Sequence, residues 1–224
     1  MRHDLYITGT DTDVGKTYVA ARLIAKLVAQ GERIAVMKPV ASGCNPTESG
    51  ALRNEDALLL MQASNVAAHY ARVNPFAFEP AIAPEYAANR VGQPVDLDVI
   101  RGAFESLKAQ SDRVVVEGAG GWLSPVNATL DQVDVMKALG IRDVILVVGM
   151  KLGCVHNARA TWQAINTHAS SSMRCVGWVA NEATGNDPEL PDNINAIRRY
   201  IDAPLLATMR HRDASHVEWQ AIPT

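Results

Sequence analysis

One short segment near the start of this 224-residue chain constrains its fold more than any other feature. Residues 9–17 read GTDTDVGKT; they follow an apolar run at residues 5–7 and lead directly into a helical pattern. A glycine-rich turn between a strand and a helix, ending in Gly-Lys-Thr, is typical of a phosphate-binding loop. Backbone N–H groups and the helix N-terminus attract phosphate oxygens there. We predict that residues 9–17 bind a nucleotide, with a purely structural strand-to-helix turn as the alternative.

The remainder of the chain alternates between two kinds of pattern. Continuous apolar runs predict strands buried on both faces at residues 5–7, 34–37, 113–116, 143–148 and 175–180. Helical patterns separate them at about residues 15–30, 55–63, 97–110, 130–139, 157–168 and 191–200. This alternation predicts an α/β fold of the phosphate-binding-loop NTPase type: a doubly wound, mostly parallel sheet with helices on both faces, in one domain over residues 1–224.

Composition excludes several classes of partner. Hydrophobic residues make up 48% of the chain and the formal net charge is −3, so the basic excess typical of binding to nucleic acid or an anionic membrane is missing. No apolar run approaches the length of a transmembrane helix, and no signal-peptide core follows the N-terminus, which favours a cytoplasmic location.

The three cysteines are far apart in the sequence and form no C-x-x-C spacing. This argues against a disulfide framework and against a zinc site. We expect reduced thiols, with Cys175 in the core and Cys44 in a polar loop where it could be exposed.

Polar side chains follow the predicted strands at the sheet edge where ligands of such folds collect. Lys38 and Ser42 follow the second strand, Glu117 ends the third, and Asn181 follows the fifth. Together with Lys16 they predict a site for an anionic substrate beside a nucleotide, with both lysines at a solvated edge. The alternatives are a Lys38 that caps its strand in solvent, a Glu117 in a structural salt bridge and an Asn181 that only serves a turn.

Several motifs in the same order make the chain resemble the dethiobiotin synthetase family over nearly its whole length. They comprise residues 8–12 and 14–17, 38–43, 52–54 with Asp56, 116–122, 151–154 and 177–181. Five residues separate Gly9 from Gly15, one more than in the general phosphate-loop pattern, and this spacing is similar to the family's own form.

The resemblance implies an ATP-dependent cyclo-ligase of biotin biosynthesis. In that reaction 7,8-diaminononanoate takes up CO₂ as a carbamate, ATP phosphorylates the carbamate, and the second amine closes a ureido ring. The products are dethiobiotin, ADP and phosphate. The resemblance also implies Mg²⁺ and a homodimer.

Residue roles are carried over only at matching positions. Lys38 and Lys16 would be catalytic, and Thr17, Asp56 and Glu117 would bind Mg²⁺. The diamine or its carbamate would contact Thr12, Ser42, Lys151, Gly153 and Asn157, the last two at a helix start that receives the substrate carboxylate across the dimer interface. The nucleotide would contact Asp13, Val14, Gly15, Lys16, Thr17, Tyr18, Asp56, Glu117, Gly118, Ala119, Gly120 and Asn181, the last at the adenine.

Other functions of the same fold remain open at this point. One is a nucleotide-dependent dimerising ATPase switch that positions a protein partner, although such switches often carry a further lysine where this chain has Thr8-Gly9-Thr10. An ATP-dependent amide ligase and an inactive relative are further alternatives. The Lys38 and Ser42 loop together with Glu117 favours retained chemistry.

Overall fold

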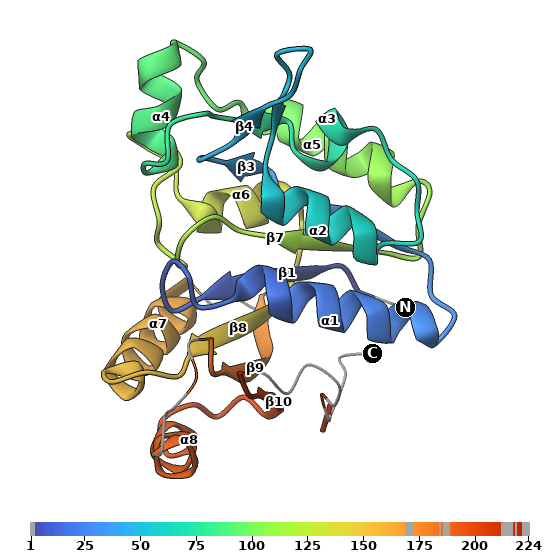
Figure 1. The fold of residues 1–224 in the computed structure, drawn as a ribbon. Coiled ribbons are helices and arrows are strands. Elements are labelled where there is room, and N and C mark those ends of the chain that lie inside the picture. The colour runs from blue at the N-terminus through green and yellow to red at the C-terminus, as the bar shows by residue number, and fades with distance from the viewer. Residues whose placement is uncertain are drawn as a thin grey trace.

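The computed structural model describes residues 3–168, 173–183, 185, 189–211, 217 and 219–220. Its centre is a six-stranded sheet in the order β10-β9-β8-β1-β7-β2, in which every neighbouring pair is parallel (Figure 1). The strands are β1 (Leu5–Gly9), β2 (Ile34–Met37), β7 (Arg113–Glu117), β8 (Asp143–Gly149), β9 (Arg174–Asn181) and β10 (Leu205–Met209). The predicted parallel α/β sheet is therefore confirmed.

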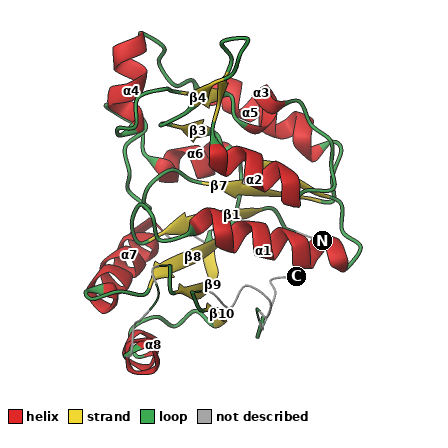
Figure 2. Ribbon diagram, viewed as in Figure 1, coloured by secondary structure: helices red, strands yellow, loops and turns green. Residues whose placement is uncertain are grey.

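Helices flank this sheet (Figure 2). They are α1 (Lys16–Ala29), α2 (Glu55–Ala63), α3 (Tyr70–Val73), α4 (Pro84–Val91), α5 (Leu97–Lys108), α6 (Gln132–Ala138), α7 (Cys154–His168) and α8 (Leu190–Arg198). From β1 the chain crosses to β2 in one direction, and every later crossover runs the other way. Since such crossovers are right-handed, α1 covers one face of the sheet and α5, α6, α7 and α8 cover the other.

The sequence patterns missed the short elements. Strand β10 and the pairs β3 (Val40–Ala41) with β6 (Phe76–Ala77) and β4 (Asn45–Pro46) with β5 (Leu52–Arg53) were not predicted, nor were α3 and α4. The two-residue strands and the four-residue α3 are too short to show a period, whereas β10 has five residues and α4 has eight. Helix α7 begins at Cys154, three residues before the start of the predicted pattern at residue 157.

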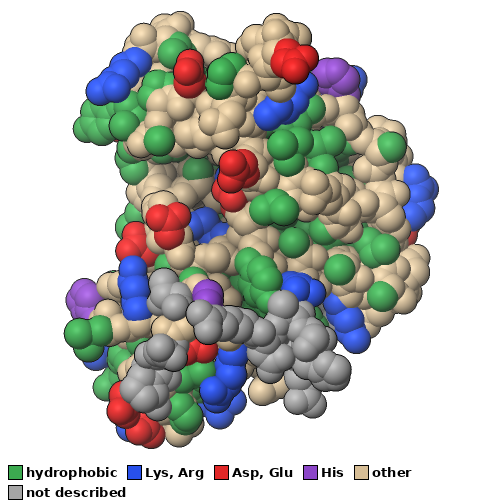
Figure 3. All heavy atoms as spheres, viewed as in Figure 1, with side chains coloured by type: hydrophobic (Ala, Val, Ile, Leu, Met, Phe, Trp, Pro, Cys, Tyr) green, Lys and Arg blue, Asp and Glu red, His purple; other side chains and the backbone are tan. Residues whose placement is uncertain are grey.

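The core follows from the apolar runs of the central strands. All residues of β1, β2, β7 and β8 are buried, as expected for strands covered by helices on both faces. Within the described residues, no helix is long and apolar enough to cross a membrane. On the face that Figure 3 shows, Lys and Arg side chains are scattered and form no single basic patch.

The last residue of β8 supports the segment that follows β1. A Cβ atom on Gly149 would lie 2.7 Å from Cγ1 and 2.9 Å from Cβ of Val14, a buried residue of the predicted phosphate loop. Glycine is therefore required at the end of β8 by the close approach of this loop.

We predict that Gly149→Ala lowers the free energy of unfolding by about 1–3 kcal/mol, because the added methyl overpacks against Val14. Gly102→Ala is the matched control, since Gly102 lies inside α5 and, beyond its own helix backbone, no atom of the described residues lies within 4 Å of the added Cβ. That control should gain about 0.5–1 kcal/mol from helix propensity. Urea unfolding of both variants measures the difference, and equal stabilities would contradict the packing argument.

Candidate active site

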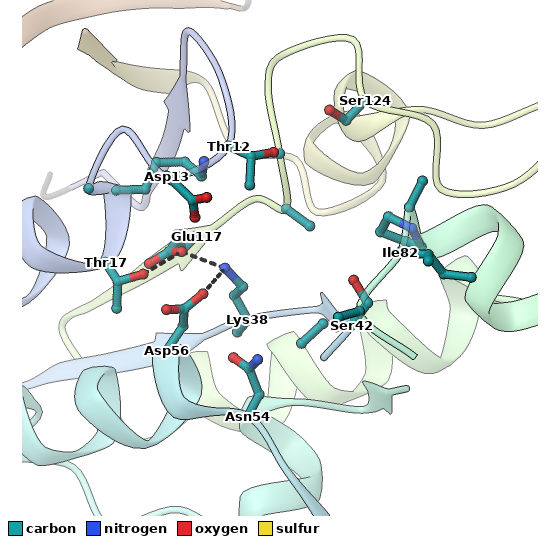
Figure 4. Close-up of a pocket in the computed structure, with 18 of the residues that line it drawn as sticks. Thr12, Asp13, Thr17, Lys38, Ser42, Asn54, Asp56, Ile82, Glu117 and Ser124 are labelled. Atoms are coloured by element: carbon teal, nitrogen blue, oxygen red, sulfur yellow. Dashed lines mark hydrogen bonds and ion pairs between the residues drawn. The ribbon is translucent and has the colours of Figure 1, made fainter. Parts of the chain in front are cut away.

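A cavity of about 910 Å³ opens at the carboxyl ends of β1, β2 and β7 (Figure 4). It is lined by Thr12, Asp13, Gly15, Lys16, Thr17, Tyr18, Lys38, Ala41, Ser42, Asn54, Asp56, Leu59, Ala81, Ile82, Ala83, Pro84, Glu117, Ala119, Gly120, Ser124 and Pro125. The lining joins segments that are far apart in the sequence. Charged groups gather where the strands end, whereas small apolar side chains form the wall built by residues 81–84.

The loop between β1 and α1 takes a conformation that few residues adopt. Asp13 and Gly15 have φ of 58° and 83°, in the left-handed region. A side chain on Gly15 would also run into the amide of Asn181. The Asn181 amide lies beneath the loop and donates a hydrogen bond to the Val14 carbonyl at 2.8 Å. Backbone strain and a buried support residue together indicate a loop held ready for a ligand.

Lys16 begins α1 and points back over the loop. Its Nζ donates to the carbonyl oxygen of Asp11 at 2.9 Å, and the residue is 7% exposed. Burial is the main cause that lowers the pKa of Lys16 from 10.5 to about 8, and the nearby charge of Lys38 adds to it. The expectation of a solvated lysine was wrong here, because α1 and the loop close around the aliphatic stem.

Lys38 is the centre of the charged cluster. Its Nζ lies 2.5 Å from Oε1 of Glu117 and 2.9 Å from Oδ2 of Asp56 (Figure 4). The Lys38 and Glu117 side chains are 5% and 1% exposed, whereas that of Asp56 is 42% exposed. The interpretation of Lys38 as a solvated strand cap was therefore wrong, and so was its placement at a solvated edge.

Burial and charge act on this cluster in opposite directions. Burial alone would lower the pKa of Lys38, but the charges and hydrogen bonds of Glu117 and Asp56 outweigh it and hold the pKa above its ordinary value. For Asp56, burial would raise the pKa, yet the Lys38 ammonium holds it below the usual range. Lys38 and Asp56 therefore stay ionised, and the Lys38 ammonium lies buried between the two carboxylate groups.

Glu117 has two further properties that suit a metal ion. The Thr17 hydroxyl donates to its Oε1 at 2.9 Å, and its Oε2 is buried and has no hydrogen-bond partner within the part of the chain that the structure describes. Among the described residues, no three His, Cys, Asp or Glu side chains come together as a complete metal site. Mg²⁺ needs no such set, because it takes one or two carboxylates and completes its shell with phosphate oxygens and water. Thr17, Asp56 and Glu117 fit this requirement.

Asp56 reaches the cluster because of how α2 begins. Asn54 caps the helix by accepting a hydrogen bond from the backbone N–H of Ala57 at 3.2 Å, and Asp56 occupies the first turn. Asparagine is a favoured N-cap, and acidic residues are stabilised in a first turn. The signal for this local structure is present in the sequence, although no role was assigned to Asn54.

The loop after β7 is held from below by buried polar groups. The Tyr6 hydroxyl donates to Oε1 of Gln132 at 2.8 Å, and the backbone N–H of Ala119 donates to the same oxygen at 3.2 Å. A Cβ on Gly118 would meet the Tyr6 hydroxyl at 2.8 Å, so Gly118 is buried and does not line the cavity. Ala119 and Gly120 do line it.

The predicted site residues fall into three groups. Most line the cavity: Thr12, Asp13, Gly15, Lys16, Thr17, Tyr18, Lys38, Ser42, Asp56, Glu117, Ala119 and Gly120. Val14, Gly118 and Asn181 are buried beside or beneath it. Lys151, Gly153 and Asn157 do not line it; Lys151 and Gly153 are exposed at the start of α7, and the Lys151 ammonium lies 3.6 Å from Oδ2 of Asp11.

Sequence reasoning missed other parts of the lining. Asn54, Leu59, Ile82, Ser124 and Pro125 line the cavity without any assigned role. Leu59 lies inside the predicted helix 55–63, and the other four lie in connecting segments, whose course the strand pattern does not reveal. Cys44 was also misplaced: it is 2% exposed and its thiol donates to the Ala41 carbonyl, because the loop folds back against residue 78. Cys175 is half-buried.

Comparison with known structures shows the fold. A signal recognition particle 54 kDa protein from Aeropyrum pernix K1, in a complex with GDP, superposes with a TM-score of 0.55 at 14% identity over 97% of this chain and 43% of that chain. A MinC:MinD cell division protein complex from Aquifex aeolicus gives a TM-score of 0.57 at 12% identity over 95% of this chain and 82% of the other.

Comparison of sequences shows the family. A family model described as an AAA domain matches residues 3–216. A protein of Xanthomonas oryzae pv. oryzae (strain PXO99A) named ATP-dependent dethiobiotin synthetase BioD is 44% identical over 216 residues, covering 96% of this chain and 94% of that protein. A protein of the same name from Xylella fastidiosa (strain Temecula1) is 43% identical, covering 93% and 90%. With these relatives, and with the loop, the buried lysine and its carboxylates in place, this chain belongs to the dethiobiotin synthetase family.

Proposed function

We propose that this protein is an ATP-dependent dethiobiotin synthetase, a cyclo-ligase that converts 7,8-diaminononanoate, CO₂ and ATP into dethiobiotin, ADP and phosphate. One observation carries the proposal beyond the relatives' name. A buried lysine between two carboxylates lies next to a phosphate loop, so the cavity brings a fixed positive charge to the place where an anionic carbamate and a γ-phosphate would meet.

The chemistry needs three steps. An amine nitrogen attacks CO₂ and loses a proton, which gives a carbamate anion. A carbamate oxygen then attacks the γ-phosphorus of ATP and ADP leaves. Finally, the second amine attacks the carbamate carbon and phosphate leaves as the ureido ring closes. Phosphorylation is necessary because a carbamate oxygen is otherwise a poor leaving group.

The protein's own groups supply position and charge in these steps. Phosphoryl transfer depends on alignment and on neutralisation of the charge on the equatorial oxygens. Lys16 would leave the Asp11 carbonyl and contact the β/γ-phosphates. Lys38, with Ser42 and Thr12 near it, would face the carbamate and stabilise the transferring group. Because Lys38 is already held in a buried site, little reorganisation is needed at the moment of reaction.

Mg²⁺ would lie among Thr17, Asp56 and Glu117, the groups whose chemistry fits it. When bound, it neutralises phosphate charge and orients the nucleotide for in-line attack. The buried Oε2 of Glu117, which none of the described residues contacts by a hydrogen bond, supports this placement.

The apolar chain of the substrate needs an apolar surface, whereas its carboxylate needs hydrogen-bond donors or a positive charge. The wall of Ala41, Ala81, Ile82, Ala83 and Pro84 would cover the chain, since it is apolar and lines the cavity beside Lys38. In a homodimer, the start of α7 would lie at the cavity of the other subunit. Its residues Lys151, Gly153 and Asn157 would bind the carboxylate of the substrate there. We place the activity in the cytoplasm and in a single domain of residues 1–224.

The decisive experiment measures ADP release from MgATP and bicarbonate with and without 7,8-diaminononanoate, followed by mass spectrometry for dethiobiotin. We expect ADP and dethiobiotin to appear together and only when the diamine is present. ATP hydrolysis that ignores the diamine would overturn the proposal and favour the nucleotide-dependent dimerising ATPase switch.

The pKa of Lys16 predicts a pH dependence of nucleotide affinity. Below a pH of about 8 the ammonium is charged and attracts the phosphates, whereas above it the free protein loses this proton. ATP affinity should therefore fall as pH rises above about 8, and binding at pH 8.5 should take up protons. Calorimetry in buffers of different ionisation enthalpy measures this uptake. AMP, which lacks the β/γ-phosphates, should show none; equal uptake with AMP would rule out Lys16 as the cause.

Lys38→Ala should damage both turnover and stability. Removal of the ammonium should lower turnover by at least ~10²-fold. It should also lower the free energy of unfolding by about 3–5 kcal/mol, because it leaves Glu117 buried without its cation. Lys108→Ala is the matched control: its ammonium contacts Asp4 at 2.6 Å but is 52% exposed, so about 0–1 kcal/mol is expected. Steady-state kinetics and urea unfolding test both; near-normal turnover of Lys38→Ala would remove that lysine from the reaction.

Glu117→Gln should change the Mg²⁺ dependence of the activity more than it changes the affinity for the diamine. The amide keeps the shape of the side chain but loses the charge that suits Mg²⁺. We expect the Mg²⁺ concentration for half-maximal activity to rise at least ~10-fold, since charged ligands are worth more than neutral ones. The KM for the diamine should change less, because Asp56 still pairs with the Lys38 ammonium. Glu55→Gln, an exposed neighbour on α2, serves as control. An unchanged Mg²⁺ titration would contradict the assignment.

A further inference from the structure

Two buried residues outside the cavity connect the segments that carry Lys38 and Asp56. They are Tyr70, in α3, and Asn74, which follows that helix; they are 9% and 2% exposed. Neither lines the cavity, and no sequence motif pointed to them. Their polar groups nevertheless form hydrogen bonds with the end of β2, where Lys38 lies, and with the start of α2, which carries Asp56.

Asn74 holds the end of β2. Its amide nitrogen donates to the backbone carbonyl of Lys38 at 2.7 Å and to that of Phe76 at 3.2 Å. The backbone N–H of Lys38 in turn donates to the Val73 carbonyl at 2.8 Å. Both backbone polar groups of Lys38 are thus bound by the segment 73–74, which fixes the point from which the lysine side chain starts.

Tyr70 holds the start of α2. Its hydroxyl donates to Oδ1 of Asn74 at 2.9 Å and accepts from the backbone N–H of Asn54 at 2.7 Å. Asn54 is the N-cap of the helix whose first turn carries Asp56. The guanidinium of Arg53 covers the Tyr70 ring at 4.1 Å from its centroid.

These contacts form a closed ring. It runs from the Lys38 backbone through Asn74 and Tyr70 to Asn54, along the first turn of α2 to Asp56, and back to the Lys38 ammonium at 2.9 Å. Because its hydroxyl and amide links are buried, loss of one leaves polar groups unpaired, so the ring resists loosening.

We propose that Tyr70 and Asn74 are positioning residues of the reaction, which set the separation between the Lys38 ammonium and the Asp56 carboxylate. This inference rests on the proposed function, in which Lys38 faces the transferring group and Asp56 faces Mg²⁺. A small error in this separation lowers the rate more than it lowers substrate binding, because alignment is used in the transition state.

The main test is Tyr70→Phe, which removes the hydroxyl and keeps the ring beneath Arg53. We expect kcat for dethiobiotin formation to fall about 3- to 30-fold, as misalignment does, while the KM for ATP stays within about twofold, as for an interaction used in the transition state. Tyr200→Phe is the matched control, since Tyr200 also lies beneath an arginine, Arg159 at 3.8 Å, but does not line the cavity. It should leave both constants unchanged.

A second readout does not depend on activity. Hydrogen exchange of the free protein should speed up at the amides of Lys38 and Ala57 in Tyr70→Phe, and remain as in the wild type along α1. Asn74→Ser, whose short side chain cannot span from the Lys38 carbonyl to Tyr70, should show the same local pattern of faster exchange. It is a second, independent test of the connection in case Tyr70→Phe does not fold.

The outcomes are separable. Unchanged kcat, unchanged exchange at Lys38 and Ala57, or faster exchange throughout the molecule would each overturn the positioning role; the last would show ordinary loss of stability. If the wild-type protein made no dethiobiotin, the proposed function would fail, and local exchange would still decide whether Tyr70 and Asn74 hold the two segments together.

Discussion

The buried ion pair between Lys38 and Glu117 is the interaction on which this site depends. An ammonium at 5% exposure and a carboxylate at 1% are stable in this place only together, and Asp56 supplies the second negative charge. The parallel sheet makes this meeting possible, since β2 and β7 are neighbours and end side by side. Each strand contributes one charged residue at its end, and α2 brings the third from the opposite wall.

Glycines and buried amides let the phosphate loop lie directly against this cluster. Gly149 admits Val14, Gly15 admits the amide of Asn181, and Asn181 in turn supports the loop through the Val14 carbonyl. Lys16 and Lys38 consequently come close enough for the charge of one to lower the pKa of the other. Glu117 and Asp56 offset part of this repulsion, and a ligand with several negative charges would offset more of it.

The same geometry explains why a fold shared with proteins such as the signal recognition particle protein can carry a ligase reaction. Only the fold is shared with that protein, and a reaction depends on the residues that a fold carries. Here the segments between β2 and α5 add the apolar wall of residues 81–84 and the Tyr70–Asn74 connection. Residues 81–84 of these segments line the cavity together with Lys38 and Asp56.

The sequence alone determined the parallel α/β architecture, the phosphate loop and most of the charged residues at the strand ends, because apolar runs and glycine spacing are local signals. It also predicted the helix over residues 55–63, which is α2, from its helical pattern. Only the tertiary structure decided that Lys16 and Lys38 are buried, that Cys44 is covered, and that Lys151, Gly153 and Asn157 lie outside the cavity of their own chain. Burial and pairing depend on which distant segments pack together, and Tyr70 and Asn74 acquire their role only when α3 brings them against Lys38 and Asn54.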